Sequence, residues 1–388
     1  MAKTATLPSG WESVALCDVC SIASERTIDF SIENYISTDN MLQDFGGVVV
    51  ASSLPTDKAI EYKKNDVLLS NIRQYLRKMW LAERTGGAST DVIVLRPKGV
   101  LPFYLFSLLK MDDFFSLLTS SAKGTKMPRG DKYNIMKYNF NLPPLAEQHR
   151  IAEILATQDS VITLKQRLID TKKQQKRWLI QNLLTGRVRL SGVKGEWKRV
   201  KLGEIGDVCM CHRIFRDETA EIGEVPFYKI GTFGAEADAF ITKKLFEEYK
   251  SKYSYPKNGE ILISAAGTIG RTVVYNGESA YYQDSNIVWL HNDEKCVYNA
   301  FLYHLYQIIN WAITTGGSVA RLYNDNIKKT KIDLPTLPEQ TAIAERLTTA
   351  DKEIELLTQE LEQQKLVKKY LMQQLLTGKI RVKGANVE

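Results

Sequence analysis

The sequence predicts an α/β (α+β) fold in which two pseudo-repeated globular domains are joined by two long antiparallel coiled-coil helices. The first observation behind this prediction is a repeat: the segment that starts at Leu142 returns 192 positions later at Leu334, and 22 of the 49 positions from 142 to 190 are identical in the two copies. The second is helical apolar spacing along both copies, over about 38 residues or on the order of 57 Å at 1.5 Å per residue. The third is that the segments before each copy share one order of short strands and a helix.

These observations divide the chain of 388 residues into four segments. We expect a first globular domain at residues 1–145, a first long helix at 146–190, a second globular domain at 191–337, and a second long helix with a C-terminal tail at 338–388. The two globular domains also begin alike, because Trp11 and Leu16 correspond to Trp197 and Leu202 at an offset of 186. The halves therefore share a plan, while their loops differ.

Within the first domain, apolar runs bounded by turn residues predict strands at residues 67–70 and 91–95. Residues 103–118 have helical spacing and are predicted to form one helix. The counterparts in the second domain are residues 258–264, 286–290 and 300–313.

In each repeated segment, prolines stand before the stretch with helical spacing, and Gly186 or Gly378 follows that stretch, as is typical of helix beginnings and ends. The apolar positions repeat with a spacing close to a heptad, so each helix needs a partner for its apolar stripe. Lysines and arginines follow residue 165 in the first copy, whereas acidic residues fill the first half of the second. Antiparallel pairing places these opposite charges together.

The composition is that of an ordinary folded protein with a net charge of +7, which allows nucleic acid as a partner without requiring it. We expect a cytoplasmic protein, because no secretory signal and no membrane-length apolar run is visible. The five cysteines have no regular spacing, which argues against a disulfide framework.

The order of a variable domain, a helix starting Leu-Pro-x-Leu-x-Glu-Gln and ending Leu-Leu-Thr-Gly, and then the same pair again resembles the specificity (S) subunit of type I restriction–modification systems. The resemblance covers almost the whole chain. It implies that each globular part is a target recognition domain for one half of a bipartite, asymmetric site on double-stranded DNA. It also implies that the helices set the half-site spacing and dock two modification (M) subunits, with restriction (R) subunits joining the complex.

The resemblance further implies that the chain is not catalytic by itself but is a subunit of a site-specific deoxyribonuclease and adenine DNA methyltransferase complex. No cofactor is expected in this chain; S-adenosylmethionine, ATP and Mg²⁺ are expected in the partner subunits. The partner-binding positions are expected at the start of each helix. They are Glu147, Gln148, Ile151, Glu153, Glu339, Gln340, Ile343 and Glu345.

Candidate DNA contacts lie in loops that follow a predicted strand or precede a long helix, where arginine, lysine and backbone amides could bind bases and phosphates. In the first domain they are Arg73, Tyr75, Arg77, Lys78, Lys126 and Arg129; in the second they are Gly267, Thr268, Gly270, Arg271, Ser318 and Arg321. The second-domain loop resembles a Gly-Thr-x-Gly loop of the family, and the first domain departs from it. A third candidate is the segment 35–38 with its counterpart 229–232, in which Ile36 and Ile230 are expected to be core residues.

Other chemistries have weaker support in the sequence. The amino-methylation motif and the Walker A lysine loop are absent. A nuclease site built on Asp57, Glu61 and Lys63 has its acids too close together, and zinc at Cys17 and Cys20 or at Cys209, Cys211 and His212 lacks the usual pair spacing. Two alternatives remain: a protein scaffold whose arms bind something other than DNA, and a fused methyltransferase.

Overall fold

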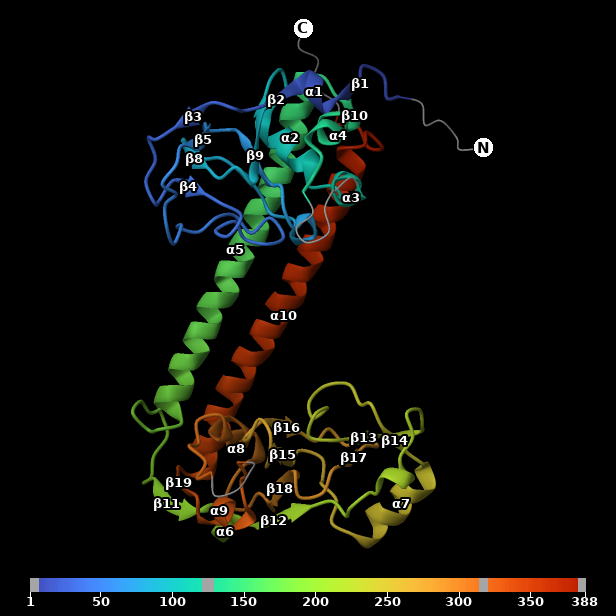
Figure 1. Cartoon of the computed structure of the whole chain (residues 1–388). Coiled ribbons are helices and arrows are strands. Elements are labelled where there is room, and N and C mark those ends of the chain that lie inside the picture. The colour runs from blue at the N-terminus through green and yellow to red at the C-terminus, as the bar shows by residue number, and fades with distance from the viewer. Residues whose placement is uncertain (1–6, 121–128, 314–319, 383–388) are drawn as a thin grey trace. The chain divides into compact units, whose positions relative to one another are not determined.

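A computed structural model describes residues 7–120, 129–313 and 320–382, which form two compact units (Figure 1). Unit 1 comprises Met1–Gln166 and Gln359–Glu388, and unit 2 comprises Arg167–Thr358. Each unit therefore contains one globular part and one section of each long helix. The predicted limits of the four segments at residues 145, 190 and 337 stay a prediction.

In unit 1 a four-stranded antiparallel sheet, in the order β2-β9-β6-β7, lies against a smaller sheet with the order β3-β5-β8-β4. A separate antiparallel pair, β1 with β10, closes the domain beside the long helix. The strands are β1 (Glu12–Ala15), β2 (Cys20–Ile22), β3 (Arg26–Thr27), β4 (Tyr35–Ile36), β5 (Ala59–Tyr62), β6 (Val67–Ser70), β7 (Met79–Leu81), β8 (Gly86–Ala88), β9 (Val92–Pro97) and β10 (Asn139–Leu142). The shorter helices are α1 (Leu16–Val19), η1 (Gln74–Leu76), α2 (Pro102–Leu109), α3 (Asp112–Ser120) and α4 (Lys132–Met136).

Strand β6 is buried along its whole length because both faces of its sheet are covered. Val67 and Leu69 belong to the core shared with the helices, whereas Leu68 belongs to the core shared with the smaller sheet. This explains why the strand reads as a continuous apolar run rather than as an alternating one.

Unit 2 repeats the plan with the sheet order β12-β18-β15-β16, a smaller sheet β14-β13-β17, and the pair β11 with β19. Ile261 and Ile263 of β15 face the helices, while Leu262 faces the smaller sheet. The strands are β11 (Lys198–Lys201), β12 (Asp207–Met210), β13 (Val225–Tyr228), β14 (Phe240–Ile241), β15 (Ile261–Ser264), β16 (Thr272–Val274), β17 (Tyr281–Tyr282), β18 (Ile287–His291) and β19 (Lys331–Leu334). The shorter helices are α6 (Leu202–Ile205), η2 (Arg216–Glu218), α7 (Lys243–Lys252), α8 (Asn299–Tyr306) and α9 (Asn324–Lys329).

The prediction of one helix over residues 103–118 is wrong, because the structure has two helices there. Helix α2 ends at Leu109, and α3 begins at Asp112 with two acidic residues in its first turn. Acidic side chains favour a helix N-terminus, so Asp112 and Asp113 suit a new start rather than a continuation. The predicted helix at 300–313 is likewise shorter, since α8 ends at Tyr306.

The two long helices are α5 (Leu145–Leu183) and α10 (Leu337–Leu375). Within each unit their sections pack antiparallel, as the charge pattern predicts. In unit 1 Lys165 binds Glu360 at 2.6 Å. In unit 2 Lys172 binds Glu353 at 2.6 Å, and Lys176 binds Asp351.

The repeated Glu-Gln pair at the start of each long helix anchors that helix to its own domain. Gln148 accepts a hydrogen bond from Leu101 N at 2.9 Å, and Gln340 accepts one from Tyr298 N at 2.9 Å. Leu101 and Tyr298 are the N-caps of α2 and α8. The glutamines therefore accept from backbone N–H groups at helix starts, which have no partner within their own helix.

The glutamates of the same pair bind the chain that follows the other long helix. Glu147 accepts two hydrogen bonds from Arg381 at 2.9 Å and one from the indole Nε1 of Trp11 at 2.9 Å. Glu339 binds Arg189 in the same way, at 2.9 and 2.5 Å. Arg189 and Arg381 are 192 positions apart, so the repeat extends to this contact.

Candidate nucleic-acid interface

In unit 1 the structure brings the three candidate segments together. Gly130 N donates to Asn71 O at 3.2 Å, which joins the segment before the long helix to the loop after β6. Lys78 Nζ donates to Thr38 O at 2.7 Å, which adds the segment that follows β4. These segments are far apart in sequence, so the fold creates the surface.

Unit 2 assembles its three segments through matching contacts. Leu322 N donates to Ala265 O at 2.9 Å, and these positions are the repeat counterparts of Gly130 and Asn71. Arg271 Nη1 donates to Phe233 O at 2.8 Å, as Lys78 does to the carbonyl of Thr38 in unit 1. Arg321 Nη2 adds a bond to Ser285 O at 2.8 Å.

Three of the predicted cations in unit 1 are held by groups of the protein itself. Arg77 binds Asp112 at 2.5 Å and lies over the ring of Phe115, and Arg129 binds Asp91 at 2.8 Å. Lys78 is bound to the carbonyl of Thr38. Their side chains therefore brace the loops, and any contact with DNA would have to compete with these partners.

Arg73 differs from these three. Its side chain is exposed, and no hydrogen bond or ion pair joins it to the part of the chain that the structure describes. Its φ of 51° lies in the left-handed region, which is strained for a residue with a side chain. Bonds from Ser70 Oγ to Ile72 O at 2.8 Å and from Gln74 Nε2 to Asn71 O at 2.9 Å hold this backbone.

Tyr75 stands next to Arg73 in η1 and is 70% exposed. Arg73 also lines a hollow of about 200 Å³ with Thr38 and Lys78, so it stands where the candidate segments meet. Arg73 and Tyr75 are thus the two predicted residues of this loop whose side chains are exposed and form no hydrogen bond or ion pair with the described residues.

In unit 2 the loop after β15 requires its glycines. Gly267 and Gly270 have φ values of 63° and 82°, and a Cβ at Gly270 would meet the Trp311 ring at 2.9 Å. Ser264 Oγ accepts a bond from Arg271 N at 2.9 Å and so fixes the loop. Gly267 and Thr268 are exposed at its tip, where backbone groups can approach a ligand.

Two predicted contacts, Lys126 and Ser318, lie outside the described residues. Sequence reasoning missed a hollow in unit 2, which is lined by Arg213, Arg216 and Gln283 beside β13. The arginines come from the stretch before β13, and only their i, i+3 spacing in the sequence could have indicated them.

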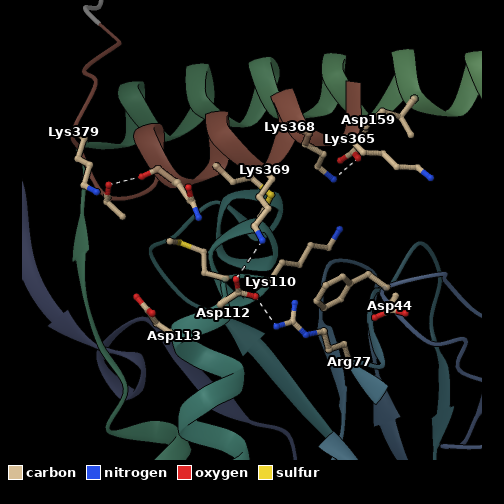
Figure 2. Close-up of a pocket in the computed structure, with 16 residues that line it drawn as sticks. Asp44, Arg77, Lys110, Asp112, Asp113, Asp159, Lys365, Lys368, Lys369 and Lys379 are labelled. Atoms are coloured by element: carbon tan, nitrogen blue, oxygen red, sulfur yellow. Dashed lines mark hydrogen bonds and ion pairs between the residues drawn. The ribbon is translucent and has the colours of Figure 1, made fainter. Parts of the chain in front are cut away.

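A cavity of about 630 Å³ in unit 1 adjoins the loop that carries Arg77 (Figure 2). Asp112 stands between two cations there: Arg77 binds one oxygen at 2.5 Å, and Lys369 lies 3.8 Å from the other. The hydrogen bond from Arg77 is the main cause of a lowered pKa of the Asp112 carboxyl. Burial, helped by nearby Lys368, lowers the pKa of Lys110 to about 8.

Most of the predicted partner-binding positions are used within the chain. Glu147, Gln148, Ile151, Glu339, Gln340 and Ile343 are buried, whereas Glu153 and Glu345 are exposed in the third turn of their helices. The assignment of these eight residues to partner binding stays a prediction. Because six of these side chains are buried, a partner could reach only exposed positions, which lie further along the helices.

The described residues contain no group of three histidine, cysteine or acidic side chains that could hold a metal ion. Cys17 is exposed, Cys20 is buried, and the ring of His212 stacks on that of Tyr253. Among the described helices, none combines the length and the apolar character that crossing a membrane requires.

Two stretches of the chain, residues 8–172 and 194–365, match the family described as type I restriction modification DNA specificity domain. The chain belongs to this family and is a type I restriction enzyme specificity subunit. The two matches correspond to the two repeats, each including part of a long helix.

Curated relatives carry names of the same family, and solved structures share the fold. A type I restriction enzyme specificity subunit from Haemophilus influenzae is 43% identical over 62% of this chain and 62% of its own length. The MjaVIII specificity subunit of Methanocaldococcus jannaschii is 28% identical over 98% of this chain and 95% of its own. The HsdS subunit of Thermoanaerobacter tengcongensis, 21% identical, covers 97% of this chain and 99% of its own with a TM-score of 0.52.

The S subunit of M. genitalium, 15% identical, covers 97% of this chain and 98% of its own with a TM-score of 0.62. At these identities the two structures bear on the fold alone. They support the predicted class of two repeated α/β domains with two long helices.

Proposed function

We propose that each globular domain of this specificity subunit reads one half of a bipartite, asymmetric double-stranded DNA site. The observation that carries the proposal is the convergence of three loop segments in each unit. One repeat-related backbone hydrogen bond joins two of them, and a side-chain bond from Lys78 or Arg271 adds the third. The bonds to Asn71 and Ala265 recur, whereas the exposed side chains differ between the units. A shared frame with different exposed side chains suits two readers of two different half-sites.

The two long helices would set the distance between the half-sites and dock two modification subunits, and restriction subunits would join that complex. The repeated helix sequences support two equivalent docking surfaces, since 22 of 49 positions are identical at a constant offset of 192. The chain would contribute no catalytic group. S-adenosylmethionine, ATP and Mg²⁺ would bind to the partner subunits.

The test uses the complete system in its host, with modified adenines mapped across the genome. We expect one bipartite, non-palindromic motif with a spacer of fixed length. Replacing residues 197–336 with the corresponding domain of a relative should change one half of the motif and leave the other half and the spacer as they were. A change in both halves, or a palindromic motif, would contradict the proposal.

Assembly is tested separately by native mass spectrometry of the co-expressed subunits. We expect one copy of this chain with two modification subunits. A complex that saturates at one modification subunit would contradict the equivalence of the two docking surfaces.

A further inference from the structure

The second halves of the two long helices display the same group of exposed side chains. On α10 this group is Lys365, Lys369 and Tyr370; on α5, 192 positions earlier, it is Lys173, Arg177 and Trp178. We call each group a basic–aromatic patch. One patch lies in each unit.

The patches are not part of the packing between the helices. Other lysines form the ion pairs between the helices: Lys368 binds Asp159, and its repeat counterpart Lys176 binds Asp351. By contrast, Tyr370 and Trp178 are 54% and 53% exposed. Tyrosine and tryptophan combine an apolar ring with a hydrogen-bond donor, which suits them to an interface with a partner.

The charges of each patch are arranged unfavourably for an isolated helix. Lys365 and Lys369 are four residues apart, as are Lys173 and Arg177, so each pair places like charges side by side. Such a pair of like charges is unfavourable on a helix. The only partners within the described chain are weak: Lys365 reaches the exposed Glu362, and Lys369 lies 3.8 Å from Asp112.

In unit 1 the patch is continuous with the candidate base-reading loop (Figure 2). Asp112 lies between Lys369 and Arg77, and Arg77 is four residues from the exposed Arg73. Lys110 faces the same cavity, with its ammonium 3.9 Å from the centre of the Phe106 ring, and it forms no ion pair with the described residues, although Asp159 lines the same cavity. An anion that extends from the loop towards α10 would therefore meet further cations.

We propose that each basic–aromatic patch binds phosphate groups of the spacer DNA, next to the half-site that is read by the domain of the same unit. This inference rests on the proposed function and deepens it. Lysine and arginine would bind phosphate oxygens, and the Tyr370 hydroxyl and Trp178 indole would donate further hydrogen bonds. These contacts carry no sequence information, as a spacer of unspecified sequence requires.

The test uses the complex of this chain with its modification subunits and two duplexes, one with the mapped site and one scrambled. Fluorescence anisotropy at several salt concentrations gives the slope of log affinity against log salt. K365Q/K369Q and K173Q/R177Q should each reduce the size of this slope by up to about 1.8, because each lost phosphate contact contributes about 0.9. Both duplexes should be affected alike, so the preference for the site should not change.

K63Q/K64Q is the matched control, since it removes two exposed lysines from a turn outside the patches. It should leave the slope unchanged. Duplexes with neutral methylphosphonate links in the spacer locate the contact. The wild-type complex should bind them less tightly than unmodified duplexes. The patch variants should bind modified and unmodified duplexes with equal affinity.

An unchanged slope in both patch variants overturns the inference. So does a patch variant that binds DNA normally but no longer assembles with the modification subunits, because the patch would then be a protein-docking surface. Failure of the proposed function looks different, since the wild-type complex itself would not distinguish the site from the scrambled duplex.

Discussion

At the residue scale, Arg73 is the predicted cation of the loop after β6 whose side chain has no partner among the described residues, which makes it the candidate for reading a base. A guanidinium can bind the O6 and N7 atoms of guanine together. We expect Arg73→Ala to weaken binding to the specific duplex by about 1–3 kcal/mol and to relax one position of the half-site that unit 1 reads. Anisotropy with duplexes substituted at each base pair measures this loss.

Arg129→Ala is the control for that experiment. Arg129 lies in an adjoining segment, but its guanidinium is bound to Asp91 at 2.8 Å. Its removal should lower the affinity for specific and scrambled duplexes by similar factors. Loss of preference at a single base in the Arg129 variant, and none in the Arg73 variant, would reverse the assignment.

The bond between Glu147 and Arg381 makes a different prediction, on stability. Burial raises the pKa of Glu147, but the hydrogen bonds from Arg381 and Trp11 outweigh it and leave the pKa below its usual value. A carboxyl with a depressed pKa stabilises the fold above the pKa of the unfolded chain, about 4.3. That contribution is lost as the pH falls through the lower, folded-state pKa.

Arg381→Ala should therefore lower the free energy of unfolding by about 1.5–3 kcal/mol at pH 7, since it leaves a buried carboxylate without its charged donor. The difference from the wild type should shrink as the pH falls below 4. Denaturant unfolding at several pH values measures both effects. Arg199→Ala is the control, because its pair with Asp333 is exposed and should contribute less than about 1 kcal/mol; an equal loss in both variants would contradict the argument.

At the scale of the elements, the long helices could be predicted almost completely. The heptad-spaced positions of the second long helix are all buried or half-buried; they are Ile343, Leu347, Ala350, Ile354, Leu357, Leu361, Gln364, Lys368, Leu371 and Leu375. Gly378 has the left-handed φ of 71° expected just after a helix. Periodicity and end signals are local, so they can be read from sequence alone. The break between α2 and α3 was missed because the apolar spacing continues across Lys110 and Met111.

The candidate base-reading loop after β6 shows why the candidate site could be predicted only in part. Arg73 and Arg77 lie four residues apart in one polar loop, and the sequence does not distinguish them. What separates them is Asp112, which binds Arg77 and belongs to another element. The burial of Glu147 and Gln148 was missed for the same reason, because their partners Arg381 and Leu101 are distant in sequence.

The proposed spacing role of the helices predicts the effect of lengthening both together. Seven residues inserted after Gln166 and seven after Thr358 would fall at the boundary between the units and preserve the heptad seam. Each helix would grow by about 10.5 Å at 1.5 Å per residue. The spacer should then lengthen by about three base pairs at ~3.4 Å each, with both half-sites unchanged.

Mapping of modified adenines in a host that carries the variant gives the spacer length directly. An insertion after Gln166 in α5 alone is the control. Pairs on the two sides of it, such as Lys165–Glu360 and Lys172–Glu353, could no longer all form along continuous helices, so stability should fall. Full activity with the original spacer length in the double-insertion variant would contradict the proposal that the helices set the half-site spacing.

At the scale of the whole chain, each unit is completed by residues that are distant in sequence. The Trp11 ring packs against Gly378 in unit 1, as the Trp197 ring packs against Gly186 in unit 2. Arg381 binds the carbonyl of Ser9 at 2.9 Å, as Arg189 binds that of Gly195. The stretch from Arg189 to Trp197 is continuous chain, whereas its counterpart in unit 1 is made by two separate segments.

This equivalence predicts that the break in the chain can be moved from one unit to the other. In the permutant, Val382 is linked to Pro8 by three residues, Ser-Gly-Val, copied from 191–193, and the new ends lie between Ser191 and Gly192, which are both exposed. Because the contacts of both units are kept, its thermal midpoint should stay within about 4 °C of the wild type, the effect of roughly 1 kcal/mol. Its methylation motif in the host should be identical.

A second permutant with the same link, opened between the buried Leu68 and Leu69 of β6, should fail to fold, because the break interrupts the central sheet. Equal loss of stability in both permutants would show that the internal connection and the paired ends are not equivalent.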